Sequence, residues 1–238
     1  MKYITLFEQQ TAFDNAKSTL DKPNMSLVTE TGNVYSLSVG GGVTYEYVDL
    51  GLSVKWAKCN VGAEKETDAG LYFAWGETTG YTASQVGTDK QFSWGDYKYG
   101  NSSSNLTKYN QSDGKTVLES TDDAAAQIMG GDWRMPTQTE IQELLTNTKH
   151  EWVTNYHNSG INGRQFTSKI NGNTIFIPAA GGCNDGSVSN VGYNGYVWSS
   201  SLYTSYPGNA WNLYFNSGNC NMSNRTRYYG QSVRGVRK

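Results

Sequence analysis

The sequence predicts an α+β fold, and two observations support that prediction. Helical patterns lie in the middle of the 238-residue chain, whereas strand patterns dominate both of its ends. Aromatic residues are abundant (7 Trp, 17 Tyr and 7 Phe), while only 17% of the residues are charged and the net charge is −2. This composition is typical of an ordered, β-rich protein with a polar surface.

Residues 1–42 are predicted to form a small separate α/β unit. Apolar residues recur on one helical face over Glu8–Leu20, which predicts a helix. Two short strands, Ser26–Val28 and Asn33–Leu37, are predicted to pair as a hairpin. Three consecutive glycines, 40–42, then form the expected linker. We expect this appendage to attach the rest of the chain to a larger carrier.

The second predicted unit, residues 43–238, opens with strands. Alternating polarity predicts strands over 44–50 and 53–57, and the apolar run 71–75 predicts a short buried segment. Residues 79–115 are rich in Gly, Ser, Thr, Asn and Tyr and show no period. We therefore expect a long loop there, and loops of this length in compact domains are commonly functional.

Two helices are predicted in the middle of this unit. Thr121–Asp123 can cap a helix over Ala124–Met129, which Gly130 would close. Thr137 and Glu140 form a capping box at the start of the second helix. The adjacent aspartates of the first cap could also be a catalytic pair of carboxylates, but capping is the favoured interpretation.

The later part of the chain is predicted to be β-structure. Arg164–Ile170 and Asn173–Pro178 flank Asn171-Gly172, which predicts a hairpin with a two-residue turn. A last strand is expected over Ser232–Val236, with its valines buried.

One of these strands alternates apolar and polar residues. We expect Trp211, Leu213 and Phe215 to face the core, and Asn212, Tyr214 and Asn216 to face outward.

The tail of the chain has the composition of a binding surface. Seven of the 17 tyrosines lie within residues 193–230, about a sixth of the chain, and no charged residue occurs between Gly186 and Asn224. Tyrosine offers a large contact area with few torsions to freeze, and Ser, Asn and Gly add adaptable hydrogen bonds. An Asn- and Ser-rich β surface without any partner is the alternative that composition leaves open.

Several classes of protein are excluded on sequence grounds. The charge of −2 disfavours a nucleic-acid partner, and no window approaches the ~20 apolar residues of a membrane span. The start of the chain lacks the apolar run of a signal peptide, so we expect synthesis in the cytoplasm. Dinucleotide, Walker A, GxSxG, HExxH and EF-hand motifs are absent, as is CxxC. We expect no catalytic residues, no cofactor and no metal.

Several segments of the chain form an ordered series of motifs. They are Tyr47-Val48-Asp49-Leu50-Gly51-Leu52-Ser53-Val54-Lys55-Trp56-Ala57, Cys59-Asn60-Val61-Gly62-Ala63, Tyr72-Phe73-Ala74-Trp75-Gly76-Glu77, Asp122-Asp123-Ala124-Ala125, Trp133-Arg134-Met135-Pro136-Thr137, Phe176-Ile177-Pro178-Ala179-Ala180-Gly181, Trp198-Ser199-Ser200-Ser201 and Gly230-Gln231-Ser232-Val233-Arg234-Gly235-Val236-Arg237. In this order they resemble a Bacteroidetes paralogous domain with the C-type lectin fold, and the resemblance implies the branch of the formylglycine-generating enzyme. The tail resembles the variable target proteins of diversity-generating retroelements, especially those of gut Bacteroides and their phages.

The second resemblance implies a hypervariable protein that binds a ligand or receptor. In that family a reverse transcriptase rewrites the 3′ end of the gene at adenines, and Asn codons of the AAC type then give Tyr, Ser, Thr, Gly or Asp without a stop. The variable region would be about residues 190–238. Within it, Trp198, Ala210, Trp211, Leu213, Phe215 and Val233 are expected to form the fixed scaffold.

The outward positions of this tail are the predicted ligand-binding residues. They are Tyr193, Asn194, Tyr196, Tyr203, Ser205, Tyr206, Gly208, Asn209, Tyr214, Asn216, Asn219, Asn221, Ser223, Asn224, Thr226 and Tyr229. Arg225 and Arg227 are left open between this surface and ordinary solvated charges. The expected partner is a cell-surface protein or glycan, reached from the surface of a phage tail or, as the less favoured alternative, of a bacterial cell.

Two rival functions are kept. An enzyme of the formylglycine-generating type would need a reactive thiol at Cys183 or Cys220, but that enzyme uses a close cysteine pair, and these two lie 37 positions apart. An invariant structural or adhesin subunit would use the same Tyr and Asn face to pack on a neighbour. The motifs of calcium-dependent sugar lectins are absent, so no Ca²⁺ is expected in the binding face.

Overall fold

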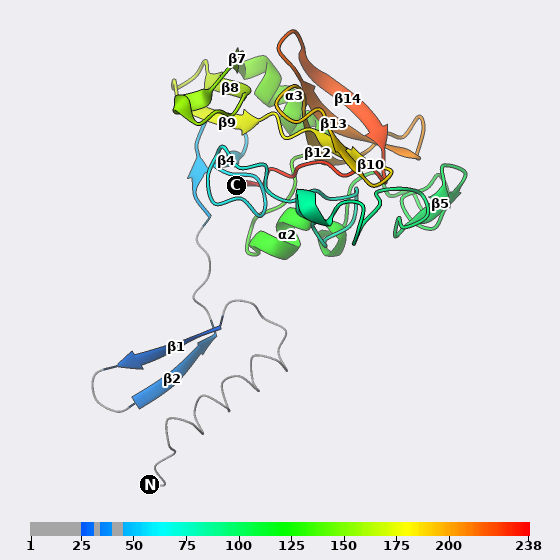
Figure 1. The fold of residues 1–238 in the computed structure, drawn as a ribbon, viewed down its shortest axis with the longest axis horizontal. Coiled ribbons are helices and arrows are strands. Elements are labelled where there is room, and N and C mark those ends of the chain that lie inside the picture. Colours follow the sequence, from blue (N-terminus) through cyan, green and yellow to red (C-terminus); the bar gives the residue numbers. More distant parts are fainter. Residues whose placement is uncertain (1–24, 31–33, 40–44) are drawn as a thin grey trace. The chain divides into compact units, whose positions relative to one another are not determined.

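The computed structural model describes residues 25–30, 34–39 and 45–238. The chain divides into two compact units, residues 1–44 and 45–238. In the first unit, β1 (Met25–Glu30) and β2 (Val34–Val39) pair antiparallel along their whole length (Figure 1). The predicted hairpin is therefore confirmed and is longer than expected, whereas the predicted helix over Glu8–Leu20 lies outside the described residues.

The second unit is mixed but strand-rich, as an α+β prediction requires, and its strands form several small sheets. The first sheet has β4 (Lys55–Ala57) at its centre, with β3 (Tyr47–Val48) on one side and β15 (Val236–Arg237) on the other. Trp56 lies opposite Val48 and Val236 in these two pairings. The last residues of the chain thus close on strands near the start of this unit (Figure 1).

The remaining strands form two antiparallel pairs and two three-stranded antiparallel meanders. They are β5 (Gly100–Ser102) with β6 (Asn105–Leu106); β7 (Thr148–Val153), β8 (Gly163–Ser168) and β9 (Thr174–Pro178); β10 (Gly182–Asn184) with β11 (Ser187–Ser189); and β12 (Gly195–Leu202), β13 (Asn209–Phe215) and β14 (Cys220–Thr226). The turn between β8 and β9 corrects the prediction: β8 ends at Ser168 and β9 begins at Thr174, so five residues make the connection instead of two. The amide of Ser168 donates to Asn173 O, and the amide of Gly172 donates to Ser168 O, which closes this longer turn.

The two predicted helices are confirmed together with their caps. The carboxylate of Asp123 accepts the amide of Ala126 at the start of α2 (Ala124–Met129), and Gly130 ends that helix with φ 68°. Thr137 and Glu140 form the reciprocal capping box of α3 (Gln138–Asn147). Within residues 45–238 there are also three short 3₁₀ turns, η1 (Ala83–Gln85), η2 (Ser120–Asp122) and η3 (Tyr156–Asn158).

The long segment 79–115 is largely irregular, as predicted, but it is not a free excursion. Phe92, Tyr97, Tyr99 and Tyr109 all turn inward and are buried. They pack into one of two hydrophobic cores of the unit, which we call the first core. Its other large members include Trp75, Trp198, Leu202 and Ala210. The aromatic residues of this loop therefore serve to fasten it to the strands.

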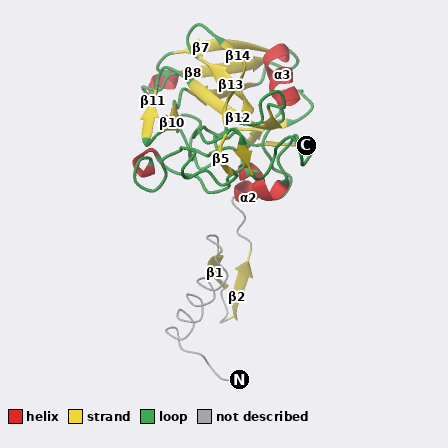
Figure 2. Cartoon of the chain, turned by 90° about the vertical axis from the view of Figure 1, so that its right-hand side faces the viewer, coloured by secondary structure: helices red, strands yellow, loops and turns green. Residues whose placement is uncertain are grey.

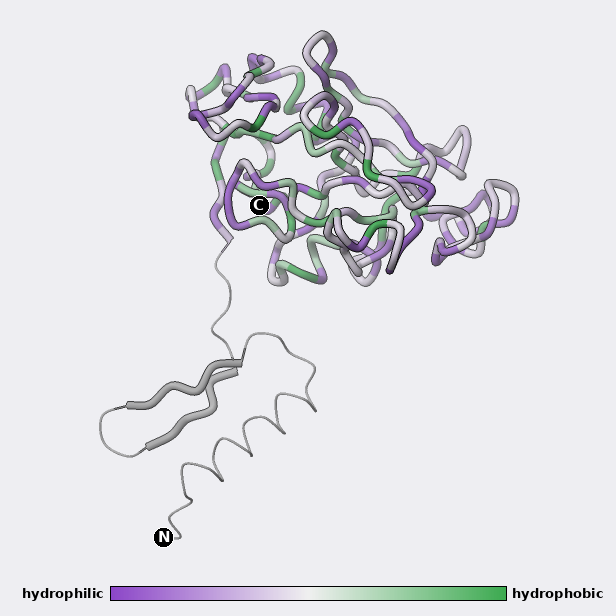
Figure 3. The backbone as a smooth tube through the Cα atoms, in the orientation of Figure 1, coloured by the Kyte–Doolittle hydropathy of each residue, from purple (hydrophilic) through white to green (hydrophobic). Residues whose placement is uncertain are grey.

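The second core lies under α3. It joins Ile141 and Leu144 of the helix to Val197, Leu213 and Phe215 of the β12–β14 sheet. Figure 3 shows short hydrophobic stretches alternating with hydrophilic ones along the whole tube of the second unit. Because β12 and β13 contribute to both cores, this sheet is covered on its two sides.

Candidate ligand-binding face

The predicted binding residues lie on and around the sheet β12–β13–β14. Tyr196 lies opposite Tyr214, and Tyr214 lies opposite Asn221, so the three positions share one side of the sheet. α3 covers the other side, and the β10–β11 hairpin lies beside the first (Figure 2). We call these the hairpin side and the α3 side.

The simple inward and outward alternation predicted for β13 is partly wrong. Leu213 and Phe215 are fully buried as expected, but Trp211 is only half-buried and packs edge-on against Tyr203 at 4.8 Å between ring centroids. Asn212, predicted to face outward, is fully buried, and its Nδ2 donates to Gln231 Oε1 at 2.9 Å. The reason is that both sides of the strand are covered, so a polar residue on the hairpin side is enclosed and needs a partner.

Two stacked tyrosines form the centre of the hairpin side. The rings of Tyr196 and Tyr214 lie 5.3 Å apart and are inclined by 30°. The amide of Asn194 donates to the hydroxyl of Tyr196 at 3.1 Å, and the amide of Asn216 donates to that of Tyr214 at 2.7 Å. The guanidinium of Arg225 lies over the Tyr196 ring, 5.5 Å from its centroid. These five residues, which we call the tyrosine platform, are thus held in place by one another.

A polar pocket of about 220 Å³ lies beside the platform. Its lining comes from the β10–β11 hairpin, the sheet and the segment that follows β14: Gly182, Asn184, Ser189, Asn190, Tyr196, Arg225, Tyr229, Gly230 and Gln231. Sequence reasoning found Tyr196 and Tyr229 and left Arg225 open, but it missed the hairpin and Gln231. The available signal was composition, because Asn184, Ser187 and Ser189 extend the Asn/Ser pattern to positions before the predicted start at about residue 190.

The other predicted residues do not all join this patch. Asn209, Asn224 and Thr226 lie on the α3 side, where the amide of Asn209 donates to Asn224 Oδ1 at 2.7 Å. Tyr193, which is 75% exposed, stands on the connection from β11 to β12. Asn221 and Ser223 lie on the hairpin side of β14, and Asn219 lies in the exposed turn before it.

A third group lies at the β12–β13 connection. Ser205 and Tyr206 line a second pocket of about 390 Å³ together with Ser103, Ser104, Leu106, Asn110, Gln111, Ser112 and Pro207. Gly208 is buried, and a Cβ atom there would lie 2.8 Å from the Cβ of Ser103. Its predicted role as a ligand contact is therefore wrong; it is a glycine because the two loops approach closely. Apart from Gly208 and the 9% exposed Tyr196, the predicted residues are at least partly exposed.

Arg225 and Arg227, two residues apart, have opposite environments. Arg225 is exposed, whereas Arg227 is fully buried and is not a surface charge. Its guanidinium donates to the hydroxyl of Tyr97 at 2.9 Å and to the carbonyl oxygens of Lys108, Tyr109 and Pro207. It also lies 4.9 Å from the ring centroid of Trp75. The residue therefore ties the long loop to the tail from inside.

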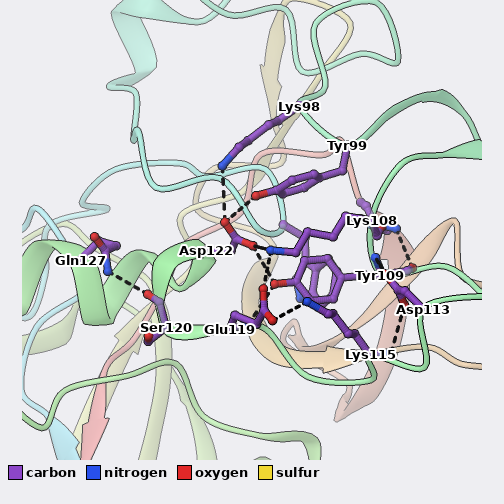
Figure 4. Close-up of polar contacts among 12 residues, drawn as sticks. Lys98, Tyr99, Lys108, Tyr109, Asp113, Lys115, Glu119, Ser120, Asp122 and Gln127 are labelled. Atoms are coloured by element: carbon purple, nitrogen blue, oxygen red, sulfur yellow. Dashed lines mark hydrogen bonds and ion pairs between the residues drawn. The ribbon is translucent and has the colours of Figure 1, made fainter.

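A second buried polar cluster surrounds Asp122 (Figure 4). Its carboxylate accepts hydrogen bonds from the hydroxyls of Tyr99 and Tyr109 and from the ammonium of Lys108, at 2.5 to 2.7 Å. Burial alone would raise the pKa of Asp122, but these bonds outweigh it and lower the pKa to about 2. Burial also raises the pKa of Tyr109 to about 12, so its hydroxyl remains a donor. Because each group of this cluster is already paired, we assign it to anchoring the long loop.

The three cysteines do not form a disulfide or a pair. Cys183 is buried in the first core, and Cys220 packs against the second core, so the β12–β14 sheet separates them. Burial raises the pKa of the Cys183 thiol to about 12 and that of Cys220 to about 11. Neither environment favours the thiolate that a nucleophilic cysteine needs.

No three His, Cys, Asp or Glu side chains come together as a metal site within residues 25–30, 34–39 and 45–238. In the same part of the chain, no helix has both the length and the apolar character needed to cross a membrane. Comparison of the sequence with protein-family models, with curated proteins and with solved structures finds no match.

Proposed function

We propose that the chain is a non-enzymatic ligand-binding protein with a C-type lectin fold, whose tail is diversified by a retroelement. One observation supports this most: on the strands β13 and β14, Tyr214, Asn221 and Ser223 are at least partly exposed. Their neighbours on β13, Leu213 and Phe215, are buried in the second core, and Ala210 is buried in the first. A protein that changes its binding residues from copy to copy needs this separation. The fold is then stabilised by residues that the ligand never touches.

Sequencing the last 150 bases of the gene from many sister cells tests the proposal. Exposed tail positions such as Tyr193, Asn219 and Asn221 should vary. Asn212 is the matched control, because it is the same residue type in the same sheet but is fully buried and bonded to Gln231. Variation at Asn221 with constancy at Asn212 and Arg227 supports a diversified binding face. A uniform tail, without a template copy and a reverse-transcriptase gene nearby, would refute it and leave an invariant structural or adhesin subunit.

The enzyme alternative receives no support from the thiols. A formylglycine-generating type of activity would place a reactive cysteine at the surface, and Cys183 is buried with a raised pKa. Native labelling with a maleimide distinguishes the two functions. We expect modification at Cys59, which is partly exposed, well before Cys183 reacts. Fast labelling of Cys183 at neutral pH would favour the enzyme.

For the carrier, we propose a phage tail, with the first unit as the attachment and a bacterial cell surface as the alternative. Immunogold labelling of purified virus particles with antibodies against residues 45–238 should decorate the tail tip. Label confined to the host envelope would show that the carrier is the cell.

A further inference from the structure

The polar pocket beside the platform has a cation without a counter-charge. Arg225 is exposed and, among the described residues, forms no ion pair and no side-chain hydrogen bond. Its guanidinium is positioned by the Tyr196 ring beneath it. The nearby carboxylate of Asp185 is turned to Asn184, whose Nδ2 donates to it at 3.0 Å. The pocket therefore presents a positioned positive charge to whatever enters it.

A second donor faces the same space. Gln231 lines the pocket although only 2% of the residue is exposed. The Oε1 atom of Gln231 accepts a hydrogen bond from Nδ2 of Asn212. The Oδ1 atom of Asn212 is buried and has no hydrogen-bond partner among the described residues. Within the same part of the chain, Nε2 of Gln231 has no hydrogen-bond acceptor. A buried amide with one end fixed and one donor free is a feature that a bound acceptor would complete.

We propose that this pocket binds the carboxylate of an acidic monosaccharide unit, a uronic- or sialic-acid type of residue, without a metal ion. This inference rests on the proposed binding function and names the chemistry of its ligand. Arg225 would pair with the carboxylate and Gln231 Nε2 would donate to an oxygen of the ligand. The side-chain amides of Asn184 and Asn190 and the hydroxyl of Ser189 would form hydrogen bonds with the hydroxyl groups of the sugar ring.

The size and lining of the pocket favour a sugar acid over an acidic peptide. A volume of about 220 Å³ is below the roughly 300 Å³ at which pockets for drug-sized ligands begin, so it suits a single compact unit. Besides the cation, the lining includes the side chains of Asn184, Ser189 and Asn190. These side chains can both donate and accept hydrogen bonds, as the hydroxyls of a sugar ring require. An acidic peptide side chain would use the cation but has no hydroxyls to pair with them.

Titration of the full-length chain, followed by NMR, tests the proposal with three small probes. D-glucuronic acid carries both the ring and the carboxylate, methyl glucoside carries the ring alone, and N-acetylglutamate carries carboxylates alone. We expect glucuronic acid to bind with a dissociation constant on the order of 1 mM. Methyl glucoside and N-acetylglutamate should each bind at least about tenfold more weakly.

Two variants localise the binding. Arg225→Gln removes the charge, and Gln231→Glu keeps the acceptor for Asn212 while placing an oxygen where the free donor was. Each substitution should raise the dissociation constant of glucuronic acid by about tenfold or more. Arg237→Gln is the charge-matched control, because Arg237 lies over Trp133 and beside Asp132, away from this pocket. It should leave the affinity unchanged, and melting curves confirm that each variant is folded.

Every other outcome overturns the inference. If methyl glucoside bound as tightly as glucuronic acid, the carboxylate would have no role in binding. If N-acetylglutamate bound as tightly as glucuronic acid, the pocket would be assigned to acidic peptides. No binding, or binding that Arg225→Gln leaves intact, would show that the pocket does not take this ligand. The failure of the wider function would be seen separately, as a tail that does not vary among sister cells.

Discussion

At the scale of single residues, the tail shows how burial decides what a side chain does. Arg225 and Arg227 have the same chemistry and nearly the same place in the sequence, yet one lies over a tyrosine at the surface and the other is enclosed. The buried guanidinium donates to three backbone carbonyls and one hydroxyl. Such a group is stabilising only while all of its partners remain in place.

Replacing the buried arginine should therefore be far more damaging than replacing the exposed one. Arg227→Met leaves the carbonyl oxygens of Lys108, Tyr109 and Pro207 without a donor, and we expect a loss of about 3 kcal/mol in the free energy of unfolding. Arg225→Met should change it by less than about 0.5 kcal/mol. Urea denaturation of both variants makes the comparison. Equal losses would show that Arg227 is not the internal tie described above.

A second pair of neighbours tests the separation between scaffold and binding surface. Phe215 is fully buried in the second core, and Phe215→Ala should cost about 3–5 kcal/mol of stability. Tyr214 is half-buried, and Tyr214→Ala should cost only about 1 kcal/mol through the lost stacking on Tyr196. Thermal melts decide the matter. If the two substitutions proved equally destabilising, the platform would belong to the scaffold.

At the scale of elements, the long loop owes its position to the cluster around Asp122. This residue ends η2, one position before the N-cap of α2, and accepts hydrogen bonds from Tyr99, Lys108 and Tyr109 of the loop. The loop in turn brings Ser103 and Asn110 to the second pocket. One carboxylate thereby fixes a stretch of chain that has little regular secondary structure of its own.

Acid should loosen this anchor in a defined pH range. The folded pKa of Asp122 is lowered to about 2 from an ordinary value of 3.8. Its contribution is therefore present above pH 3.8 and is lost as the pH falls toward 2. We expect the stability difference between the wild type and Asp122→Asn to shrink by about 2 kcal/mol between pH 5 and pH 2. Denaturation curves at several pH values measure it, and a difference that is independent of pH would contradict the assignment.

The elements that the sequence predicted well are those with local signals. The cap at Asp123 and the capping box of Thr137 and Glu140 each specify a helix start within four residues. The prediction that one face of β13 is buried and the other exposed was partly wrong. An alternation of apolar and polar residues shows only that the two faces of a strand differ, and here other parts of the protein cover both faces. The burial of Asn212 depends on Gln231, 19 residues away, which no local pattern encodes.

At the scale of the whole molecule, the candidate site also depends on contacts between distant segments, which local sequence patterns do not encode. Composition predicted most of the exposed positions of the tail, because Tyr, Asn and Ser are enriched at binding surfaces and, as polar residues, tend to be exposed. It could not show that these residues divide among the hairpin side, the α3 side and the β12–β13 connection. It also could not find the β10–β11 hairpin as a wall of the pocket, since that depends on how distant segments pack.

The second unit should fold without the first. Residues 45–238 contain both hydrophobic cores and all three strands of the sheet around β4. A chain that begins at Tyr45 should keep the melting temperature of the second unit within about 2 °C, because it loses none of these contacts. Calorimetry of the shortened and full-length chains provides the test. A shortened chain that aggregates or melts much lower would show that the two units depend on each other.

The pairing of β15 with β4 makes the last residues of the chain necessary for a complete fold. Arg234 is fully buried and donates to the carbonyl oxygens of Ala57, Lys58 and Phe176, and Val236 pairs with Trp56. These contacts are encoded downstream of the platform. In the proposed retroelement system, a miscopied tail that shifts the reading frame or stops early would lack them. Folding would then act as a check on the rewritten gene. Only in-frame copies would give a chain that folds completely and resists proteolysis.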